Sequence, residues 1–347
     1  MSEIAILGAG YMGSAISFPL RANGHGVRLW GTWLDDELVR GCREGRHPRL
    51  KKPLPEGVRI YDSTRLEEAL DGARAVFFGI ASEGFEPVYR KLLEYMDPEV
   101  PVFSLTKGFV PLGERLLRTS EAAETLSRER PDARKPRWVS IGGPVKAVEL
   151  SDGIPTASVY ATGDPGLRDS ILSFRTPVYR TIPGHDLIGL ELCASLKNAY
   201  AILLGICDGL YRGEAGRLFD NVKALFLTAC VGELATYVRS AGGSDRTVYG
   251  LPGMGDLQVT AQSGRNRRFG ELIGGGTPAN EAYRTMYEAG EIAEGYHAVR
   301  HGWEYARMLD PGLPSRLPIL SALRGILAEE IPVRKAVDGL VEGYPYR

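Results

Sequence analysis

A lysine in an apolar stretch is the first residue of this sequence that could do chemistry. Lys197 lies within Glu191–Cys207, where almost every other side chain is uncharged. Burying an unpaired ammonium is costly, so such a lysine either reaches solvent or is held for use. Desolvation lowers the pKa of a lysine toward neutrality, which suits a general acid or base. Asp208 falls on roughly the same helix face and Asn198 is adjacent, so we interpret Lys197 as catalytic.

A second stretch combines glycine with positive charge. Between Gly250 and Gly270 the sequence holds several glycines, one acid, Asp256, and three arginines. We predict a loop whose glycines bring the backbone close to an anionic ligand, with Arg265 as a planar clamp. The other two arginines, Arg267 and Arg268, are expected to be solvated.

A glycine fingerprint stands near the start of the sequence. Gly8, Gly10 and Gly13 follow an apolar run and open a helical pattern. In this context the first glycine allows a tight turn, the second lets a pyrophosphate approach the backbone, and the third lets helix and strand pack closely. The pyrophosphate rests on the N-terminus of the helix, where free N–H groups favour anions. The pattern predicts a nicotinamide or flavin dinucleotide site.

The residues after the second strand leave the choice of dinucleotide open. An NAD site expects an acid at the end of that strand, about 20 residues beyond the glycines. Trp30, Gly31 and Thr32 stand there instead, and Asp35 is the first acid. No arginine follows the strand directly, so the usual mark of NADP is also missing.

Two further strands lead into segments typical of ligand-binding loops. Lys107 and Gly108 follow one of them, and Gly142–Pro144 leave another. Ligands of open α/β sheets bind at the carboxyl ends of the strands, where both segments are expected to lie.

The first half of the chain alternates short apolar runs with helical patterns. This alternation predicts an α/β fold with an N-terminal Rossmann domain, a parallel doubly wound sheet, over residues 1–185. The predicted strands are Ile4–Leu7, Val27–Trp30, Ala75–Ile80, Pro101–Leu105, Arg137–Ile141, Thr156–Ala161 and Pro177–Ile182. The predicted helices are Glu83–Tyr95, Leu112–Ser127 and Gly166–Phe174.

The second half shows helical patterns and no strand signal. We predict an all-helical C-terminal domain, which binds the substrate, over residues 186–347. Its predicted helices are Asp186–Leu210, Asn221–Gly243, Ala279–Glu288, Tyr296–Met308 and Leu317–Glu329. Apolar residues surround the first of these almost completely, which is typical of a core helix.

The composition excludes several classes of function. A formal net charge of −1 provides no overall field for nucleic acid or an anionic membrane. The four cysteines form no Cys-x-x-Cys pair and fit buried free thiols in a reducing compartment. The five histidines show no metal-ligand spacing, so no metal site is expected. No signal peptide or membrane span is apparent, and the cytoplasm is the expected location.

Taken in order, these motifs resemble those of the NAD(P)-dependent glycerol-3-phosphate dehydrogenases. The resemblance spans about residues 4–325 and is most specific at the Lys-Asn pair and the Asp-Leu…Arg-Asn-Arg segment. Its segments are GAGYMGSA, SLTKGF, GGPVKAVE, LKNAYAILLGICDGL, DNVKALFLTACVGE, GMGDLQVTAQSGRNRRFG and AEGYHAV. It implies hydride transfer between NAD(P)H and dihydroxyacetone phosphate to give sn-glycerol 3-phosphate, a phospholipid precursor, by a homodimer.

The resemblance also implies a role for each matching residue. Lys197 would be the general acid/base at the substrate carbonyl, Asp256 would lie beside it, and Lys107 would orient the substrate. The implied substrate-binding residues are Lys107, Gly143, Val145, Asn198, Thr260, Gly264, Arg265 and Asn266. The implied cofactor-binding residues are Gly8, Gly10, Tyr11, Met12, Gly13, Trp30, Lys107, Ala147, Arg265, Ile292 and Glu294.

Departures from the family pattern keep two alternatives open. Val145 and Lys146 stand where the family carries Ser or Asn and then Phe, so one polar contact to substrate is lost and one charge is added. A reductase of another phosphorylated or phosphonate ketone or aldehyde is therefore the alternative. A non-catalytic dinucleotide sensor is a second alternative, but it has no need of the lysines and Asp256 together. The related β-hydroxyacid dehydrogenases carry Lys and Asn one turn apart, whereas here the two are adjacent.

Overall fold

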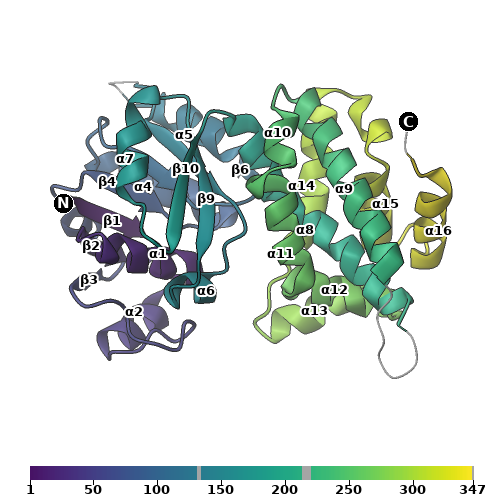
Figure 1. Cartoon of the computed structure of the whole chain (residues 1–347), viewed down its shortest axis with the longest axis horizontal. Coiled ribbons are helices and arrows are strands. Elements are labelled where there is room, and N and C mark those ends of the chain that lie inside the picture. Colours follow the sequence, from purple (N-terminus) through teal and green to yellow (C-terminus); the bar gives the residue numbers. More distant parts are fainter. Residues whose placement is uncertain (131–133, 213–219, 346–347) are drawn as a thin grey trace. The chain divides into compact units, whose positions relative to one another are not determined.

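The computed structural model describes residues 1–130, 134–212 and 220–345. The chain forms two compact units, Met1–Leu187 and Ile188–Arg347. Figure 1 shows the sheet of the first unit in purple to teal and the helices of the second in green to yellow.

An eight-stranded sheet forms the centre of the first unit. Its strand order is β10-β9-β8-β5-β4-β1-β2-β3, so the direction of winding reverses between β1 and β4. Open α/β sheets bind ligands beyond the carboxyl ends of the strands at such a reversal. The strands are β1 (Glu3–Leu7), β2 (Gly26–Trp30), β3 (Val58–Tyr61), β4 (Ala75–Phe78), β5 (Val102–Ser104), β8 (Trp138–Gly142), β9 (Thr156–Ala161) and β10 (Tyr179–Gly184). The predicted Rossmann domain is confirmed.

One pair of neighbouring strands departs from the predicted parallel sheet. β8 and β9 run antiparallel, whereas all other neighbours in this sheet are parallel. The short helix α6 (Ala147–Ser151) joins them and packs against α1 (Tyr11–Ala22). The chain therefore does not cross back over the sheet before β9 begins, and β9 runs in the opposite direction.

Helices cover both faces of the sheet, as its apolar strands require. Ile4 and Ile6 of β1 pack into one core, and Ala5 and Leu7 pack into the other. Such burial on two sides explains why the strands read as continuous apolar runs. The first core includes side chains of α1, α2 (Asp36–Arg43), α6 and α7 (Arg168–Ser173). The second includes those of α3 (Leu66–Leu70), α4 (Phe85–Tyr95) and α5 (Thr119–Ser127).

The predicted helix Leu112–Ser127 is wrong over its first half. Val110–Leu112 (β6) and Arg115–Leu117 (β7) form an antiparallel hairpin, and only Thr119–Ser127 is helical. Gly113 adopts φ +59 at the turn of this hairpin, a conformation that favours glycine. The sequence interpretation also missed β3, α2 and α3.

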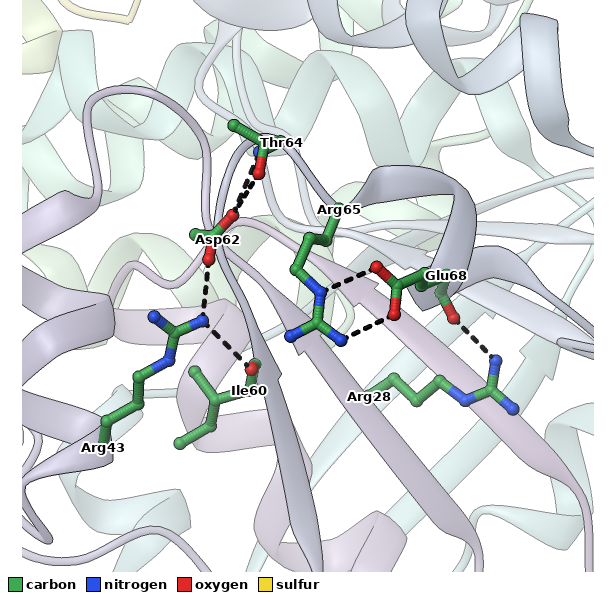
Figure 2. A network of polar contacts seen from close by, with 7 residues as sticks. All are labelled: Arg28, Arg43, Ile60, Asp62, Thr64, Arg65 and Glu68. Carbon is green, nitrogen blue, oxygen red and sulfur yellow. Dashed lines mark hydrogen bonds and ion pairs between the residues drawn. The ribbon is translucent and has the colours of Figure 1, made fainter.

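Arginines hold α2 and α3 at the β2–β3 edge of the sheet (Figure 2). Arg43 of α2 donates to Asp62 over 2.9 Å, just beyond β3. Arg28 of β2 donates to the backbone oxygen of Glu68 in α3 over 3.0 Å. Arg43 and Arg28 therefore attach the two helices to the strands of this edge.

The described part of the second unit contains helices and no strand, which confirms the prediction. Its helices are α8 (Leu187–Leu210), α9 (Asp220–Ser240), α10 (Asp245–Val248), α11 (Asp256–Gln262), α12 (Arg265–Gly274), α13 (Ala279–Glu288), α14 (Glu294–Leu309), α15 (Pro318–Leu327) and α16 (Val333–Gly343). Among the described helices, α8 alone is long and apolar enough to cross a membrane. Because 89% of its most apolar window is buried, α8 has the features of a core helix.

Candidate active site

The candidate residues lie in two groups, one within each compact unit. The first unit holds the glycine fingerprint, Lys107 and the segment Gly143–Ala147. The second holds Lys197, Asn198, the segment Asp256–Asn266, Ile292 and Glu294.

The three fingerprint glycines differ in the backbone conformation and in the space around each of them. Gly8 adopts φ +99, and a Cβ there would lie 2.6 Å from the backbone oxygen of Gly79. A Cβ on Gly13 would lie 2.0 Å from the oxygen of Gly8. At Gly10 a Cβ would meet only the Arg49 guanidinium, at 4.0 Å. Gly8 and Gly13 therefore build the turn, whereas Gly10 keeps the space beside it open for a ligand.

The N-terminus of α1 is prepared for an anion. The helix begins at Tyr11, no side chain caps it, and its first turn carries no acid. The N–H groups of that turn have no partner within the helix and carry the positive end of its dipole. Together with the open space at Gly10, these residues fit the pyrophosphate of a dinucleotide.

The acid nearest to the end of β2 is occupied by the backbone. Oδ2 of Asp35 accepts from Thr32 N and Thr32 Oγ1 over 2.9 Å each, and from Ala9 N over 3.3 Å. One oxygen of this carboxylate is therefore engaged in closing the turn. The Trp30 side chain is fully buried in the core. The contact that we expected between this side chain and a cofactor is therefore not supported by its exposure.

Lys107 follows β5 in a loop that is tied to the loop after β4. Thr106 Oγ1 donates to the backbone oxygen of Ile80 over 2.7 Å. Gly108 adopts φ +120, and a Cβ there would lie 3.0 Å from Ser82 Oγ. Burial raises the pKa of Tyr179 in β10, and hydrogen bonds with Ser158 and Tyr160 and, least of all, the charge of Lys107 oppose this rise.

The segment after β8 contains the apolar residue Val145 and the charged residue Lys146. Gly143 adopts φ +141, and a Cβ there would lie 3.0 Å from the oxygen of Ala157. Val145 packs against the first core, and Ala147 begins α6. Lys146 lies 3.6 Å from Glu149, so its charge is partly met within α6.

In the second unit, a buried ion pair joins Lys197 and Asp256. Lys197 lies near the middle of α8 and is 6% exposed; Asp256 begins α11 and is 1% exposed. The ammonium donates to Oδ1 of Asp256. The carboxylate offsets the cost of burying the ammonium, which explains how a charged residue occupies an apolar helix.

Glu294 connects two other predicted site residues. Its Oε2 accepts from Asn198 Nδ2 over 3.1 Å, and its Oε1 accepts from Arg265 Nη2 over 3.2 Å. Asn266 Oδ1 in turn accepts from Gly295 N over 2.8 Å, next to Glu294. The N-termini of α11, α12 and α14 therefore deliver Asp256, Arg265 and Glu294 to one region of α8.

The predicted glycine-rich loop Gly250–Gly270 is largely helical. A π-helical turn (Leu251–Gly255) leads into α11, and α12 follows after Gly264, which adopts φ +133. A Cβ on Gly253 would lie 2.1 Å from the oxygen of Val248, so this glycine serves close packing. The expectation of a loop is therefore wrong over most of this segment, where Gly253 and Gly270 allow close packing between helices.

Thr260 and Ile292 lie outside the contacts that join Asn198, Arg265 and Glu294. Thr260 Oγ1 donates to the backbone oxygen of Asp256 within α11, over 2.7 Å. Ile292 is exposed, in the segment before α14. Their roles toward substrate and cofactor stay predictions.

Close backbone packing fixes α12 against α8. A Cβ on Gly205 would lie 2.0 Å from the oxygen of Arg267, and one on Gly270 would lie 2.1 Å from the oxygen of Ile202. Gly209 and Gly274, each four residues further along its helix, are equally constrained. These glycines form a seam that sets the position of Arg265 and Asn266 relative to Lys197.

Arg267 lies beside this seam, and the expectation that it is solvated is wrong. Its Nε lies 2.5 Å from Oδ2 of Asp208, and its side chain is 20% exposed. Lys223 of α9 lies 3.0 Å from the same carboxylate, which is 1% exposed. Arg268 is 60% exposed and pairs with Glu291 over 2.8 Å, in keeping with the expectation for that residue.

Three contacts near the site were not foreseen. They are the bridge from Glu294 to Asn198, the pairing of Asp208 with Arg267, and a hydrogen bond from His47 to Ala9 in the fingerprint. Asp208, an acid within the apolar helical stretch of α8, was a sequence signal for the second of these. Among the described residues, no group of three or more His, Cys, Asp or Glu side chains could hold a metal.

Two family models together match most of the chain. The model described as NAD-dependent glycerol-3-phosphate dehydrogenase N-terminus matches residues 3–167, and the corresponding C-terminus model matches residues 186–338. The chain belongs to the NAD-dependent glycerol-3-phosphate dehydrogenase family.

Individual relatives agree with this assignment. An NADP(+)-dependent glycerol-3-phosphate dehydrogenase of Archaeoglobus fulgidus is 33% identical and covers 96% of this chain and 97% of its own length. A glycerol-3-phosphate dehydrogenase [NAD(P)+] of Symbiobacterium thermophilum is 35% identical and covers 98% and 93%. The crystal structure of the Coxiella burnetii glycerol-3-phosphate dehydrogenase is 29% identical, covers 98% and 99%, and has a TM-score of 0.82. The predicted enzyme class and the undecided cofactor, NAD or NADP, are confirmed.

Proposed function

We propose that Lys197, Asp256, Arg265, Asn266 and Lys107 carry the reduction of dihydroxyacetone phosphate to sn-glycerol 3-phosphate. The observation that supports this most is the buried Lys197–Asp256 pair in the same unit as the Arg265–Glu294–Asn198 cluster. A polarised acid/base and a guanidinium that can bind phosphate are what the reaction needs in one place.

Each residue has a distinct task in this proposal. A dinucleotide whose pyrophosphate is held at the Gly8–Gly13 fingerprint would supply, from its nicotinamide ring, the hydride that C2 of the substrate receives. The Lys197 ammonium donates a proton to the oxygen on C2 and regains one from solvent. Asp256 holds that ammonium in place, and Lys107 orients the substrate oxygens.

The phosphate end of the substrate is assigned to α12. Arg265 offers a planar guanidinium, and the Nδ2 group of Asn266 is a second donor because its Oδ1 is engaged by Gly295. Gly264 and the amides at the start of α12 add donors of the kind that bind phosphate at helix N-termini. Thr260, Gly143, Val145 and Ala147 complete the proposed contacts to substrate and cofactor.

The decisive variant is Lys197→Ala. We expect kcat to fall by about 100-fold to 10 000-fold, the usual contribution of a general acid/base. Binding of NAD(P)H, followed by its fluorescence, should persist. Turnover close to that of the wild type would remove Lys197 from the mechanism.

The first assay follows absorbance of reduced nicotinamide with dihydroxyacetone phosphate, run separately with NADH and NADPH. The ratio of the two rates settles the cofactor. The protein could bind dinucleotide and yet oxidise neither NADH nor NADPH in the presence of dihydroxyacetone phosphate. In that case the proposed substrate is instead another phosphorylated or phosphonate ketone. Val145 and Lys146 are then the first residues to exchange.

We further propose a division of labour between the predicted domains and a homodimer in the cytoplasm. Residues 1–185 would bind the dinucleotide and residues 186–347 the substrate, in keeping with the fingerprint in the first and the Lys197 cluster in the second. The dimer and the location are supported by the family resemblance. Light scattering coupled to size exclusion tests the dimer.

A further inference from the structure

A buried histidine pins the segment after α2 to the glycine fingerprint. His47 is fully buried, and its Nδ1 accepts from the backbone N–H groups of Arg49 and Leu50 over 3.1 Å each. The proton therefore lies on Nε2, which donates to the backbone oxygen of Ala9 over 2.9 Å. Because Ala9 lies between Gly8 and Gly10, the histidine fixes the backbone of Arg49 beside the fingerprint turn.

The Arg49 side chain extends over that turn. Its guanidinium carbon lies 5.8 Å from the centre of the Tyr11 ring. Among the described residues, and apart from Gly10, its chain neighbours and the local helix backbone, its Nη1 alone lies within 4.0 Å of the place that a Cβ on Gly10 would occupy. The guanidinium is thus beside the space that Gly10 keeps open and beside the first turn of α1.

Arg49 differs from other arginines of this region in the partners of its guanidinium. Arg43 is paired with Asp62 over 2.9 Å, and Arg65 is paired with Glu68 over 2.6 Å, as Figure 2 shows. Arg46 donates to the backbone oxygen of Lys51 over 3.2 Å. Within residues 1–130 and the other described ranges, Arg49 has no carboxylate partner. Its positive charge therefore adds to that of the uncapped helix terminus.

We propose that Arg49 is a further binding residue for the phosphate groups of the dinucleotide, held over the fingerprint by His47. This inference rests on the proposed role of Gly8–Gly13 in binding the dinucleotide. A guanidinium binds phosphate oxygens through two parallel N–H donors, and it adds a positively charged side chain to the backbone amides of α1. His47 is a positioning residue: it supplies no group to the ligand.

The test compares Arg49→Gln with Arg46→Gln, a matched change in the same segment. Dissociation constants for NADH and NADPH are measured by nicotinamide fluorescence at about 0.1 M salt, where exposed charges are only partly screened. We expect Arg49→Gln to weaken binding by about tenfold, and Arg46→Gln to leave it within about twofold, since only the first removes a charge-assisted contact. Arg49→Lys should recover part of the loss.

The two cofactors distinguish which phosphate is bound. An equal loss for NADH and NADPH assigns Arg49 to the pyrophosphate, and a loss confined to NADPH assigns it to the 2′-phosphate. Either result supports the proposal. Binding of both cofactors by Arg49→Gln as tightly as by wild type overturns it. A wild-type protein that binds neither cofactor contradicts the dinucleotide site itself, which is a different failure.

Discussion

The carboxylate of Asp208 and the guanidinium of Arg267 form an ion pair 2.5 Å apart, although the two residues are 59 positions apart in the sequence. The pair joins α8, which carries Lys197, to α12, which carries Arg265. Because the Asp208 side chain is 1% exposed, the carboxylate depends on Arg267 and Lys223 for compensation.

Replacing this carboxylate should destabilise the second unit. Asp208→Asn leaves two cations facing a buried amide, and we expect a loss of about 3 kcal/mol in the free energy of unfolding. Chemical denaturation monitored by circular dichroism measures it. Adding Arg267→Gln should restore part of the loss, and additive effects of the two changes would show that the pair is not coupled.

The glycine seam should not tolerate a methyl group. Gly205→Ala places a Cβ 2.0 Å from the oxygen of Arg267, so α8 and α12 must move apart. We expect unfolding free energy to fall by about 2 kcal/mol or more, together with weaker substrate binding. Thermal denaturation and the KM for substrate check both effects.

The matched control is Gly232→Ala, in the exposed face of α9. In the part of the chain that the structure describes, and apart from the local backbone of α9, no atom lies within 4 Å of a Cβ at this position. Alanine favours helix over glycine by about 1 kcal/mol, so this variant should be slightly more stable than wild type. If both alanine variants behaved alike, steric contact would not be the reason for the seam.

Asp256→Asn tests the partner of the catalytic lysine. The amide keeps the shape of the side chain but removes the charge that offsets the buried ammonium of Lys197. We expect kcat to fall by about 100-fold while the dissociation constant for NAD(P)H changes less than about twofold. Stopped-flow turnover and fluorescence titration separate these quantities, and an unchanged kcat would show that Asp256 is structural.

A second buried acid should make stability depend on pH. Glu233 of α9 accepts from Ile319 N over 2.6 Å, Leu320 N over 2.9 Å and Tyr200 Oη over 3.1 Å. Burial raises its pKa to about 8, although the two backbone donors oppose this. The folded state therefore binds more protons than the unfolded state between the ordinary carboxyl pKa and about 8.

Stability from this group is thus greatest in acid and is lost as pH rises through that window. We expect the unfolding free energy of wild type, measured relative to that of Glu233→Gln, to fall as pH is raised from about 5 to about 8. Urea unfolding at several pH values measures it. If the stability of wild type relative to Glu233→Gln rose with pH instead, Glu233 would be buried as a carboxylate.

Much of this architecture could be predicted from the sequence because it depends on local patterns. The strands at Ile4–Leu7 and Thr156–Ala161 are apolar runs bounded by polar turns, and α8 is too long for a strand. The glycine fingerprint was recognisable because it stands between the first strand and the first helix. Lys197 stood out because its neighbours are apolar.

The remaining features depend on contacts between distant residues. Gly205 and Gly270 look like helix-weakening residues until the backbone of the facing helix is known. Arg267 appeared solvated because its partner, Asp208, belongs to another helix. The hairpin before α5 was missed because its residues also fit a helical pattern.

The four cysteines have a practical consequence for work on this enzyme. All are buried free thiols, and burial raises the pKa of Cys42 to about 11 and that of Cys207 to about 12. Thiolates, the species that alkylating dyes attack, are therefore scarce and shielded in the native protein. A single cysteine engineered onto the surface can be labelled selectively without first deleting the natural ones, so fluorescent reporters can be attached to the otherwise unmodified chain.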